Sequence, residues 1–362
     1  MAQQRVAVLV TDHGWGHASR MTPLAAALLE TGAAVAVVAS RSVGRAIADA
    51  VPGVEVIAGA LDRGLRVTAG AMRANPEATL PLLRESLAAP DEALRAAVVA
   101  WAPDVLVADA TPWAPRLAQA CGARSVLCSN FSWDDQYEAI FGATEEVLAL
   151  REVVRGYDLG LVMPFGPGLP SVAVTEPAPL ISRVPATSPT AVRAALHVPA
   201  GAKLITWAMG RTPAEVQPEA AIRAIAAVAA RWRAAFAASE AVVGPLGIEG
   251  LIAVPDDASF VDLVASSDLV ISKAGYSTVV ETLRGPGRVI VLTSIGTAEE
   301  RGLAAEVERR EVGAVIEVGS EAWLDRLGAA VEALLALPPR APDTTCGERW
   351  IAERVLRLAA EG

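Results

Sequence analysis

The fold is decided by one stretch, Arg5 to Ser40, which reads RVAVLVTDHGWGHASRMTPLAAALLETGAAVAVVAS. The β-branched run Arg5 to Thr11 predicts a buried strand, and Ser19 to Thr31 has the apolar spacing of a helix. Another apolar run, Ala34 to Ala39, predicts a second strand. Two consecutive strands joined by a helix are typical of a parallel sheet. The stretch therefore predicts a sheet built from strand–helix–strand units.

The same alternation continues through two separate segments of the chain. It runs to about residue 165 and fails between Pro164 and Pro199, where eight of 36 residues are proline. Such a segment favours an extended connection. The alternation then resumes, with a helix expected over Ala220 to Ala237 and a short strand over Ala241 to Val243. The sequence thus predicts an α/β fold with two Rossmann-like domains facing a cleft, residues 1–165 and 185–345. The terminal helix, within 346–362, is expected to pack back on the first domain.

Composition and charge restrict the classes of partner. A net charge of −10 disfavours nonspecific binding to nucleic acid. The apolar runs are too short, or too often interrupted by Arg, for a membrane-spanning helix, and no signal-peptide core precedes the first strand. The three cysteines lack the close spacing of metal ligands. We expect a cytoplasmic protein that binds small molecules, without a metal site, membrane span or nucleic-acid partner.

Two of the three histidines occupy the loop between the first strand and the first helix. Open α/β folds bind ligands at this end of the sheet. Gly14 and Gly16 would permit close approach of the backbone to a ligand, and His13 or His17 could accept a proton from a hydroxyl. Two alternatives remain. One is a turn in which His17 caps the helix and His13 packs near Trp15. The other is a dinucleotide site, which fits poorly because the spacing is not G-x-G-x-x-G.

A second loop with a similar position occurs in the later domain, at Ser272 to Glu281, with the sequence SKAGYSTVVE. Gly275 would allow a ligand to approach, and the backbone amides of Tyr276, Ser277 and Thr278, together with Lys273, would attract an anion such as a diphosphate. Glu281, one helical turn later, could accept hydrogen bonds from two ribose hydroxyls. The alternative is that Ser277 is only an N-cap and Glu281 a solvated helix residue.

Other candidate residues follow strands in the two domains. Gly210 and Arg211 come after the first strand of the second domain and could bind a phosphate, although such a pair is common at strand ends. In the first domain the candidates at or after strand ends are Asp109, Asn130, Trp133 and Asp134. Aromatic and acidic groups together suit a hydroxylated acceptor. A solvated loop anchored by Trp133 is an equally good interpretation.

These motifs resemble the GT-B glycosyltransferases of family 28, in which a Gly-His loop precedes a Ser-Lys-Ala-Gly-x-Ser-Thr-x-x-Glu element. More specifically, His13 to Arg20, Arg124 to Trp133 and Ile271 to Glu281 are similar to the glycosyltransferase-like N-terminal domain of L-arabinokinases. That domain normally precedes a sugar kinase. The chain carries no Gly/Ser-rich ATP loop of the kinase type, so kinase activity is not expected.

The resemblance implies roles for individual residues. His17 would be the catalytic base or the residue that orients the acceptor; His13 and Asp109 are the other candidate catalytic residues of the sequence. Lys273 to Thr278 would bind the diphosphate and Glu281 the ribose, with no metal and no cofactor. Family members often hold the donor sugar with an Asn-Gln or Asp-Gln pair, whereas this chain has Glu299 and Glu300 in that region.

The sequence therefore predicts inverting, metal-independent transfer of a sugar from a nucleoside diphosphate sugar to an acceptor. A nucleotide-sugar hydrolase is the enzymatic alternative, because water could replace the acceptor. A non-catalytic module that binds sugar nucleotides is the other alternative. The sequence identifies neither base, sugar nor acceptor, and it carries no signal of oligomeric state.

Overall fold

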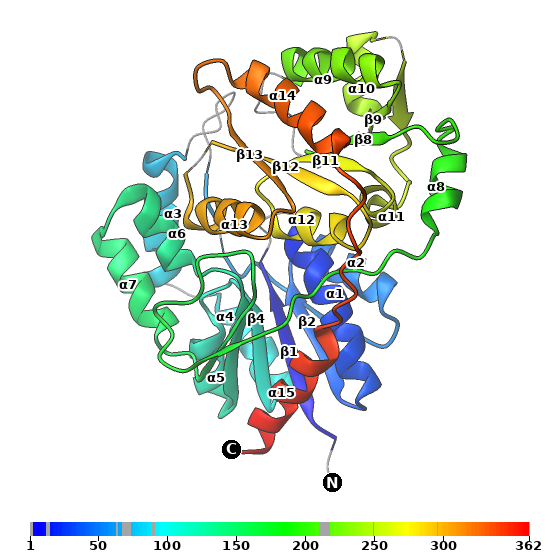
Figure 1. Cartoon of the computed structure of the whole chain (residues 1–362). Coiled ribbons are helices and arrows are strands. Elements are labelled where there is room, and N and C mark those ends of the chain that lie inside the picture. Colours follow the sequence, from blue (N-terminus) through cyan, green and yellow to red (C-terminus); the bar gives the residue numbers. More distant parts are fainter. Residues whose placement is uncertain are drawn as a thin grey trace.

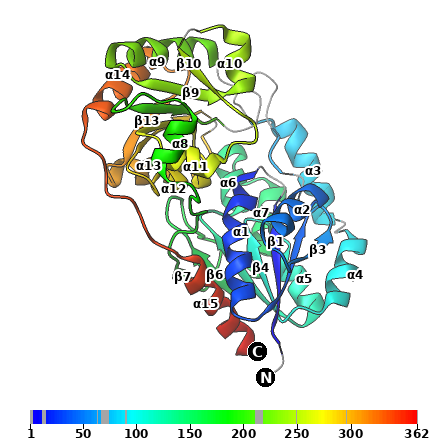
Figure 2. The same ribbon diagram turned by 90° about the vertical axis from the view of Figure 1, so that its right-hand side faces the viewer.

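The computed structural model describes residues 3–11, 15–62, 64–66, 74–88, 91–209, 218–248, 250–294 and 296–361. In these ranges the chain forms two parallel sheets, one in each domain, with helices packed around them (Figure 1). The two-domain α/β fold expected from the sequence is confirmed. The two domains are in direct contact along one side of each (Figure 2).

The first sheet has the strand order β3-β2-β1-β4-β5-β6-β7, and its pairings are parallel. Its strands are β1 (Arg5–Val10), β2 (Ala34–Ala39), β3 (Glu55–Ala58), β4 (Val105–Asp109), β5 (Arg124–Ser129), β6 (Leu159–Val162) and β7 (Thr175–Pro177). Its helices are α1 (Trp15–Glu30), α2 (Arg41–Ala50), α3 (Pro76–Ala88), α4 (Glu92–Trp101), α5 (Ala114–Cys121), α6 (Trp133–Phe141) and α7 (Glu145–Val154).

Alternating residues of β1 supply the cores on the two faces of this sheet. Val8 packs in one cluster with Leu24 of α1, whereas Leu9 packs in another with Leu94 of α4 and Leu117 of α5. A continuous apolar strand is the expected pattern for a parallel sheet covered on both faces. The polar side chains are thereby left at the ends of the strands, where the site is built.

The second sheet has the order β10-β9-β8-β11-β12-β13. Its strands are β8 (Leu204–Trp207), β9 (Ala235–Ser239), β10 (Leu251–Val254), β11 (Leu269–Lys273), β12 (Arg288–Thr293) and β13 (Gly313–Glu317). The accompanying helices are α8 (Pro189–Ala195), α9 (Pro218–Trp232), α10 (Glu240–Leu246), α11 (Phe260–Ala265), α12 (Tyr276–Thr282), α13 (Ala298–Arg309) and α14 (Trp323–Ala336). In each sheet the strand order reverses next to the first strand of the domain, between β1 and β4 in the first sheet and between β8 and β11 in the second. The carboxyl ends of the strands at such a reversal form the usual ligand-binding position of open α/β sheets.

The chain crosses between the domains twice. The first crossing follows β7, and the second leads from α14 to α15 (Glu348–Ala360), which lies against α1 of the first domain (Figure 2). Ile351 of α15 is fully buried in the first-domain core. The two crossing segments touch, because the backbone N–H of Gly347 donates to the carbonyl of Leu180 at 3.1 Å.

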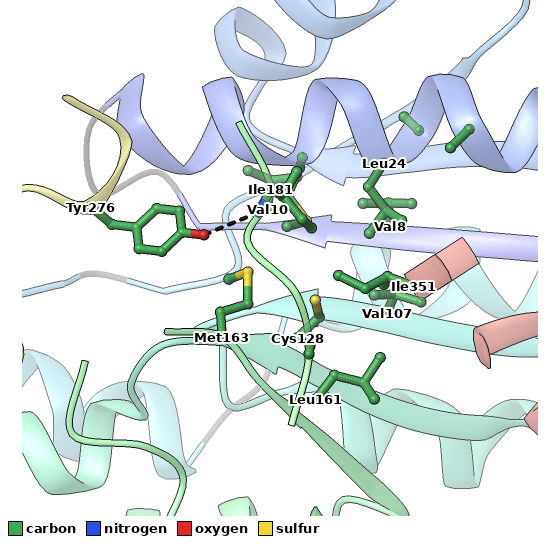
Figure 3. Packing of buried hydrophobic residues seen from close by; sticks show 14 of the residues in the cluster. Val8, Val10, Leu24, Val107, Cys128, Leu161, Met163, Ile181, Tyr276 and Ile351 are labelled. Atoms are coloured by element: carbon green, nitrogen blue, oxygen red, sulfur yellow. Dashed lines mark hydrogen bonds between the residues drawn. The ribbon is translucent and has the colours of Figure 1, made fainter. Parts of the chain in front are cut away.

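One apolar cluster extends across the domain boundary. Ile181 of the first crossing packs in it together with Val8, Val10 and Tyr276, and the backbone N–H of Ile181 donates to the hydroxyl of Tyr276 at 3.1 Å (Figure 3). On α13, a Cβ at Gly302 would lie 2.5 Å from the backbone of Gly166. The domains therefore meet through close backbone contacts as well as through side chains.

Three local expectations were wrong. The helix predicted over Ala220 to Ala237 ends at Trp232, because Arg233 adopts a left-handed conformation with φ of 50° and β9 begins at Ala235. The strand predicted over Ala241 to Val243 is helix α10. The connection between Pro164 and Pro199 contains β7 and α8, although much of it is extended. In the first two cases tertiary context overrides local propensity: alanine favours helix but forms most of β9, and Val242 and Val243 favour strand but lie in α10.

Within the ranges that the structure describes, no helix is both long and apolar enough to span a bilayer.

Candidate active site

The candidate site lies where β1, β4 and β5 of the first domain end next to α12 and α13 of the second. It contains three of the first-domain residues predicted from the sequence, His17, Asp109 and Asn130. His13 and Gly14 lie outside the described residues, as do Gly210 and Arg211 of the second domain. The site is therefore described from Trp15 onwards in the first loop.

His17 is held by the carboxylate of Asp109. Its Nδ1 lies 2.9 Å from Oδ2 of Asp109, and the two side chains are 12% and 0% exposed. Nδ1 also lies 3.0 Å from Nη2 of Arg20, which is a donor, but Nη2 already donates to Oδ1 of Asp109. Because an ionised carboxylate can only accept hydrogen bonds, we assign the proton to Nδ1, as a donor to Oδ2 of Asp109. The other ring nitrogen, Nε2, is then the basic atom when the imidazole is neutral. The edge of Phe131 packs against the ring, with centroids 6.0 Å apart, and limits its rotation.

Arg20 is the central residue of this cluster, although the sequence analysis gave it no role. Its side chain is 2% exposed. Nε and Nη2 donate to the two oxygens of Asp109, and Nη1 donates to Oδ1 of Asn130 at 2.7 Å. Burial alone would raise the pKa of Asp109. The charge of Arg20, the charge that His17 carries when protonated, and the bonds from both residues outweigh burial and hold that pKa below its usual value. Asp109 is therefore ionised at neutral pH.

A sequence signal for Arg20 did exist. It lies three residues after His17 on α1, a spacing that places both side chains on one face of the helix. Asp109, at the end of the neighbouring strand β4, is the acid that such a pair would require.

Asn130 joins this cluster to the second domain. Its Nδ2 donates to the carbonyl of Phe165 at 3.0 Å and to Oε1 of Glu299 at 3.1 Å. The backbone N–H of Glu299 donates in turn to Oε1 of Gln136, at 3.0 Å. Burial raises the pKa of Glu299 above its usual value, although Arg20 and the bond from Asn130 oppose the increase. Glu299, a predicted donor-sugar ligand, thus lies at the junction and faces the His17 cluster.

The second predicted loop contacts the first one directly. The hydroxyl of Ser277 donates to the carbonyl of Gly16 at 2.7 Å, so it does not cap its own helix; the N-cap of α12 is Gly275. Tyr276 is buried, and Arg20 lies over its ring with 5.2 Å between guanidinium carbon and ring centroid. Lys273 is exposed and Thr278 partly buried at the same loop. The structure therefore brings both predicted loops together.

Glu281 has an internal partner. Its carboxylate is 1% exposed and accepts from Nε and Nη2 of Arg183, at 2.7 and 3.0 Å. Burial raises the pKa of Glu281, and Arg183 opposes the increase. Arg183 comes from the crossing segment and is 33% exposed. The prediction that Glu281 is a solvated helix residue is wrong. Its predicted contact with ribose stays a prediction, and that contact would require release from Arg183.

Three other candidates have their own internal contacts. Glu300 accepts from the backbone N–H groups of Ser294 and Gly296 and so orders the loop before α13. Asp134 is 0% exposed and pairs with Arg151, Nε to Oδ2 at 3.2 Å. Trp133 stacks on Tyr137 with 5.3 Å between centroids, which favours the anchoring role considered for it. The structure does not place Glu300 or Asp134 in the His17 cluster.

A pocket of about 400 Å³ opens in the first domain beside Trp113, which follows β4. Its apolar lining comes from Leu61, Leu94, Trp113 and Leu117. Its charged lining residues are Asp62, Glu85, Asp91, Arg95 and Arg116. A smaller cavity of about 20 Å³ shares Asp62 and Trp113 with it and is lined also by Trp133 and Tyr137. The aromatic side chains after β5 therefore separate the His17 cluster from an apolar hollow.

Sequence comparison finds a curated relative, the L-arabinokinase of Arabidopsis thaliana, which is 27% identical over 294 residues. The match covers 76% of this chain but 27% of the relative, so the chain spans about a quarter of that protein. No protein-family model matches the chain.

Comparison of structures extends over the whole chain. The glycotransferase of kitacinnamycin is similar with a TM-score of 0.68 and 17% identity, over 100% of this chain and 95% of that one. UGT89C1 of Arabidopsis thaliana, complexed with quercetin, has a TM-score of 0.66 and 16% identity, over 100% and 96%. VinC, a glycosyltransferase in complex with dTDP, has a TM-score of 0.63 and 19% identity, over 99% and 100%. The chain has the GT-B fold. At these identities the likeness concerns the fold, and within this GT-B fold the His17 cluster lies at the junction of the two sheets.

Proposed function

We propose that this GT-B protein transfers a sugar from a nucleoside diphosphate sugar to a hydroxylated acceptor, with inversion at the anomeric carbon. The observation that carries the proposal is the His17–Asp109 pair, 2.9 Å apart, at the junction of the two domains. Asp109 orients the imidazole and fixes the proton on Nδ1. Nε2 can then accept the proton of the acceptor hydroxyl as its oxygen attacks the sugar.

The second domain would stabilise the leaving diphosphate. Lys273 supplies a positive charge, and Gly275 and Thr278 belong to the loop that lies next to Gly16. A cation and oriented backbone amides can stabilise the charge that develops on a leaving diphosphate without a metal ion. Because Ser277 contacts Gly16 directly, the two loops have to separate for the diphosphate to enter between them. Closure would then exclude water from the reacting atoms.

The acceptor would bind to the first domain. The hollow whose apolar lining comes from Leu61, Leu94, Trp113 and Leu117 supports an acceptor with an apolar or aromatic body. An acceptor bound there would have to extend past Phe131 and Trp133 for its hydroxyl to reach His17. Hydrogen bonds to the sugar would come from Asn130 and Glu299, which face the His17 cluster. Quercetin in the UGT89C1 complex is an example of an aromatic ligand bound by a protein of similar fold.

A thermal-shift screen followed by a turnover assay tests this function. UDP, GDP, ADP and dTDP, each with its common sugars, are offered to the native chain and to His17→Gln. At about 100-fold saturation a ligand of the folded state adds about 2.7 kcal/mol of stability. One nucleotide series should raise the Tm of both proteins. With an acceptor, His17→Gln should then reduce kcat by about 10²- to 10⁴-fold while donor affinity changes little.

The other outcomes separate the alternatives. Sugar release that does not depend on any acceptor would identify a hydrolase. Nucleotide binding without turnover in the native chain would identify a binding module. If no nucleotide raised the Tm, the transfer proposal would be abandoned.

A further inference from the structure

Arg20 has no part in the proton transfer proposed above, yet it makes more polar contacts than His17. Its buried guanidinium reaches both oxygens of Asp109, the amide oxygen of Asn130 and, at 3.4 Å, the hydroxyl of Ser129. A buried arginine with this set of partners is costly to maintain unless its charge is matched. The charge that matches it is Asp109, the same carboxylate that holds His17.

Asp109 therefore interacts with two basic side chains, Arg20 and His17, and makes more hydrogen bonds with Arg20. The carboxylate carries one negative charge, and Arg20 supplies one positive charge in a bidentate arrangement. The Arg20–Asp109 pair is neutral by itself, so the cluster of Arg20, Asp109 and His17 is neutral only if His17 is neutral as well. A protonated His17 would place a second positive charge against one carboxylate, 3.0 Å from Nη2 of Arg20. Without Arg20, His17 would be the only cation within reach of Asp109 in the described part of the cluster.

The second domain completes the surroundings of the guanidinium. The ring of Tyr276 lies over Arg20, and Glu299 faces it through Asn130. Among the described residues, the charged or titratable groups around His17 and Arg20 are thus Asp109 and Cys128 from the first domain, and Tyr276 and Glu299 from the second. Burial disfavours the charged form of Glu299, so it is a weak competitor of Asp109 for these cations.

We propose that Arg20 is a positioning residue that balances the charge of Asp109 and thereby keeps His17 in the neutral form, with Nδ1 protonated and Nε2 open. The use of Nε2 as a base rests on the proposed function, whereas the charge arrangement can be tested without substrate. Arg20 also holds the plane of the carboxylate, because a guanidinium fork fits both carboxylate oxygens at once. An ammonium group could match the charge but not this geometry.

The test is ¹⁵N NMR of the full chain labelled at histidine. The sequence contains only three histidines, and His13→Gln and His197→Gln assign the signals. Near neutral pH the native His17 should show one protonated and one bare nitrogen. In Arg20→Met both nitrogens should be protonated, and the double variant Arg20→Met/Asp109→Asn should return to the neutral pattern. In turnover, Arg20→Met should reduce kcat about 100-fold or more, with the donor KM within about twofold.

Arg151→Met is the matched control. It removes an arginine from another fully buried carboxylate, that of Asp134, and should leave the His17 signals unchanged. Arg20→Gln repeats the test if Arg20→Met does not fold. The proposal is overturned if the native His17 is an imidazolium near neutral pH, or if His17 stays neutral in whichever Arg20 variant folds. A native chain with the predicted spectrum but no sugar transfer would instead refute the proposed function and leave the role of Arg20 standing.

Discussion

Two regions of this protein have the same local order of a strand, a glycine-containing loop and a helix: β1 to α1 and β11 to α12. Their polar side chains make different kinds of contact. In helix α1, directly after the first loop, His17 and Arg20 converge on Asp109 and leave one ring nitrogen of His17 available for chemistry. In the second loop, Ser277 bonds to Gly16, Tyr276 to Ile181, and Glu281 to Arg183. The first region therefore has its proposed catalytic groups already assembled. The second is engaged in contacts that hold the domains together, and some of these contacts have to open for a donor to bind.

The largest effect that tests this difference is expected from Asp109→Asn. It removes the charge partner of a buried arginine, which typically costs about 3 to 5 kcal/mol of stability, and it also releases His17. We expect a large fall in Tm and loss of turnover. The exposed pair Glu92–Arg95 provides the control, since Glu92→Gln should leave the Tm unchanged. A small effect of Asp109→Asn would mean that the first loop is not organised around this carboxylate.

An intermediate effect, on nucleotide affinity, is expected at the Arg183–Glu281 ion pair, where one variant replaces each partner. If Glu281 binds ribose after leaving Arg183, then Glu281→Gln should weaken nucleoside diphosphate binding about tenfold, or about 1.4 kcal/mol. Arg183→Met should tighten binding, because a larger fraction of the chain then has a free Glu281. Isothermal titration with the nucleotide found in the screen measures both.

Equal changes of affinity in these two variants would contradict that role. They would mean that Glu281 and Arg183 act only as an anchor between the crossing segment and α12, and both variants would then lower the Tm alike.

The smallest expected effect concerns Glu299, where the domains meet. Its pKa in the folded chain lies above the ordinary value of 4.5, so the folded state binds this proton more tightly than the unfolded chain. That stabilisation is complete below the ordinary pKa and is lost as the pH rises through the folded value. Glu299→Gln should therefore raise the Tm slightly at neutral pH and have no effect near pH 4.

Glu300→Gln is the neighbouring control for this prediction. Its carboxylate accepts two backbone N–H groups, so the amide should lower the Tm at neutral pH. If the Tm of Glu299→Gln fell as well, the folded chain would favour the charged carboxylate and the stated direction of its pKa would be wrong.

The sequence predicted the two α/β domains and both loops because periodicity and glycine position are local signals. It also named His17, Asp109, Asn130 and Glu299, which the structure brings to one junction. It could not predict Arg183 as the partner of Glu281, because that contact depends on how the crossing segment passes α12. The boundary between α9 and β9 was equally hidden, since it depends on the left-handed conformation of Arg233 inside an alanine-rich segment.

The contact between the two crossing segments determines how the domains can move. Gly347 is bonded to Leu180, and a Cβ at Gly347 would lie 2.4 Å from that carbonyl oxygen, so the two segments are pinned together at one point. We expect two connections joined in this way to favour rotation of the second domain about this point over translation away from the first. Atoms near the axis of a rotation move least, and both partners of the Arg183–Glu281 pair lie close in the chain to these contacts. Arg183 is three residues from Leu180. Glu281 is two residues from Leu283, whose carbonyl accepts from the backbone N–H of Asp343 in the other segment. Opening of the domains would thus leave the Arg183–Glu281 pair closed, and the donor itself would have to displace Arg183.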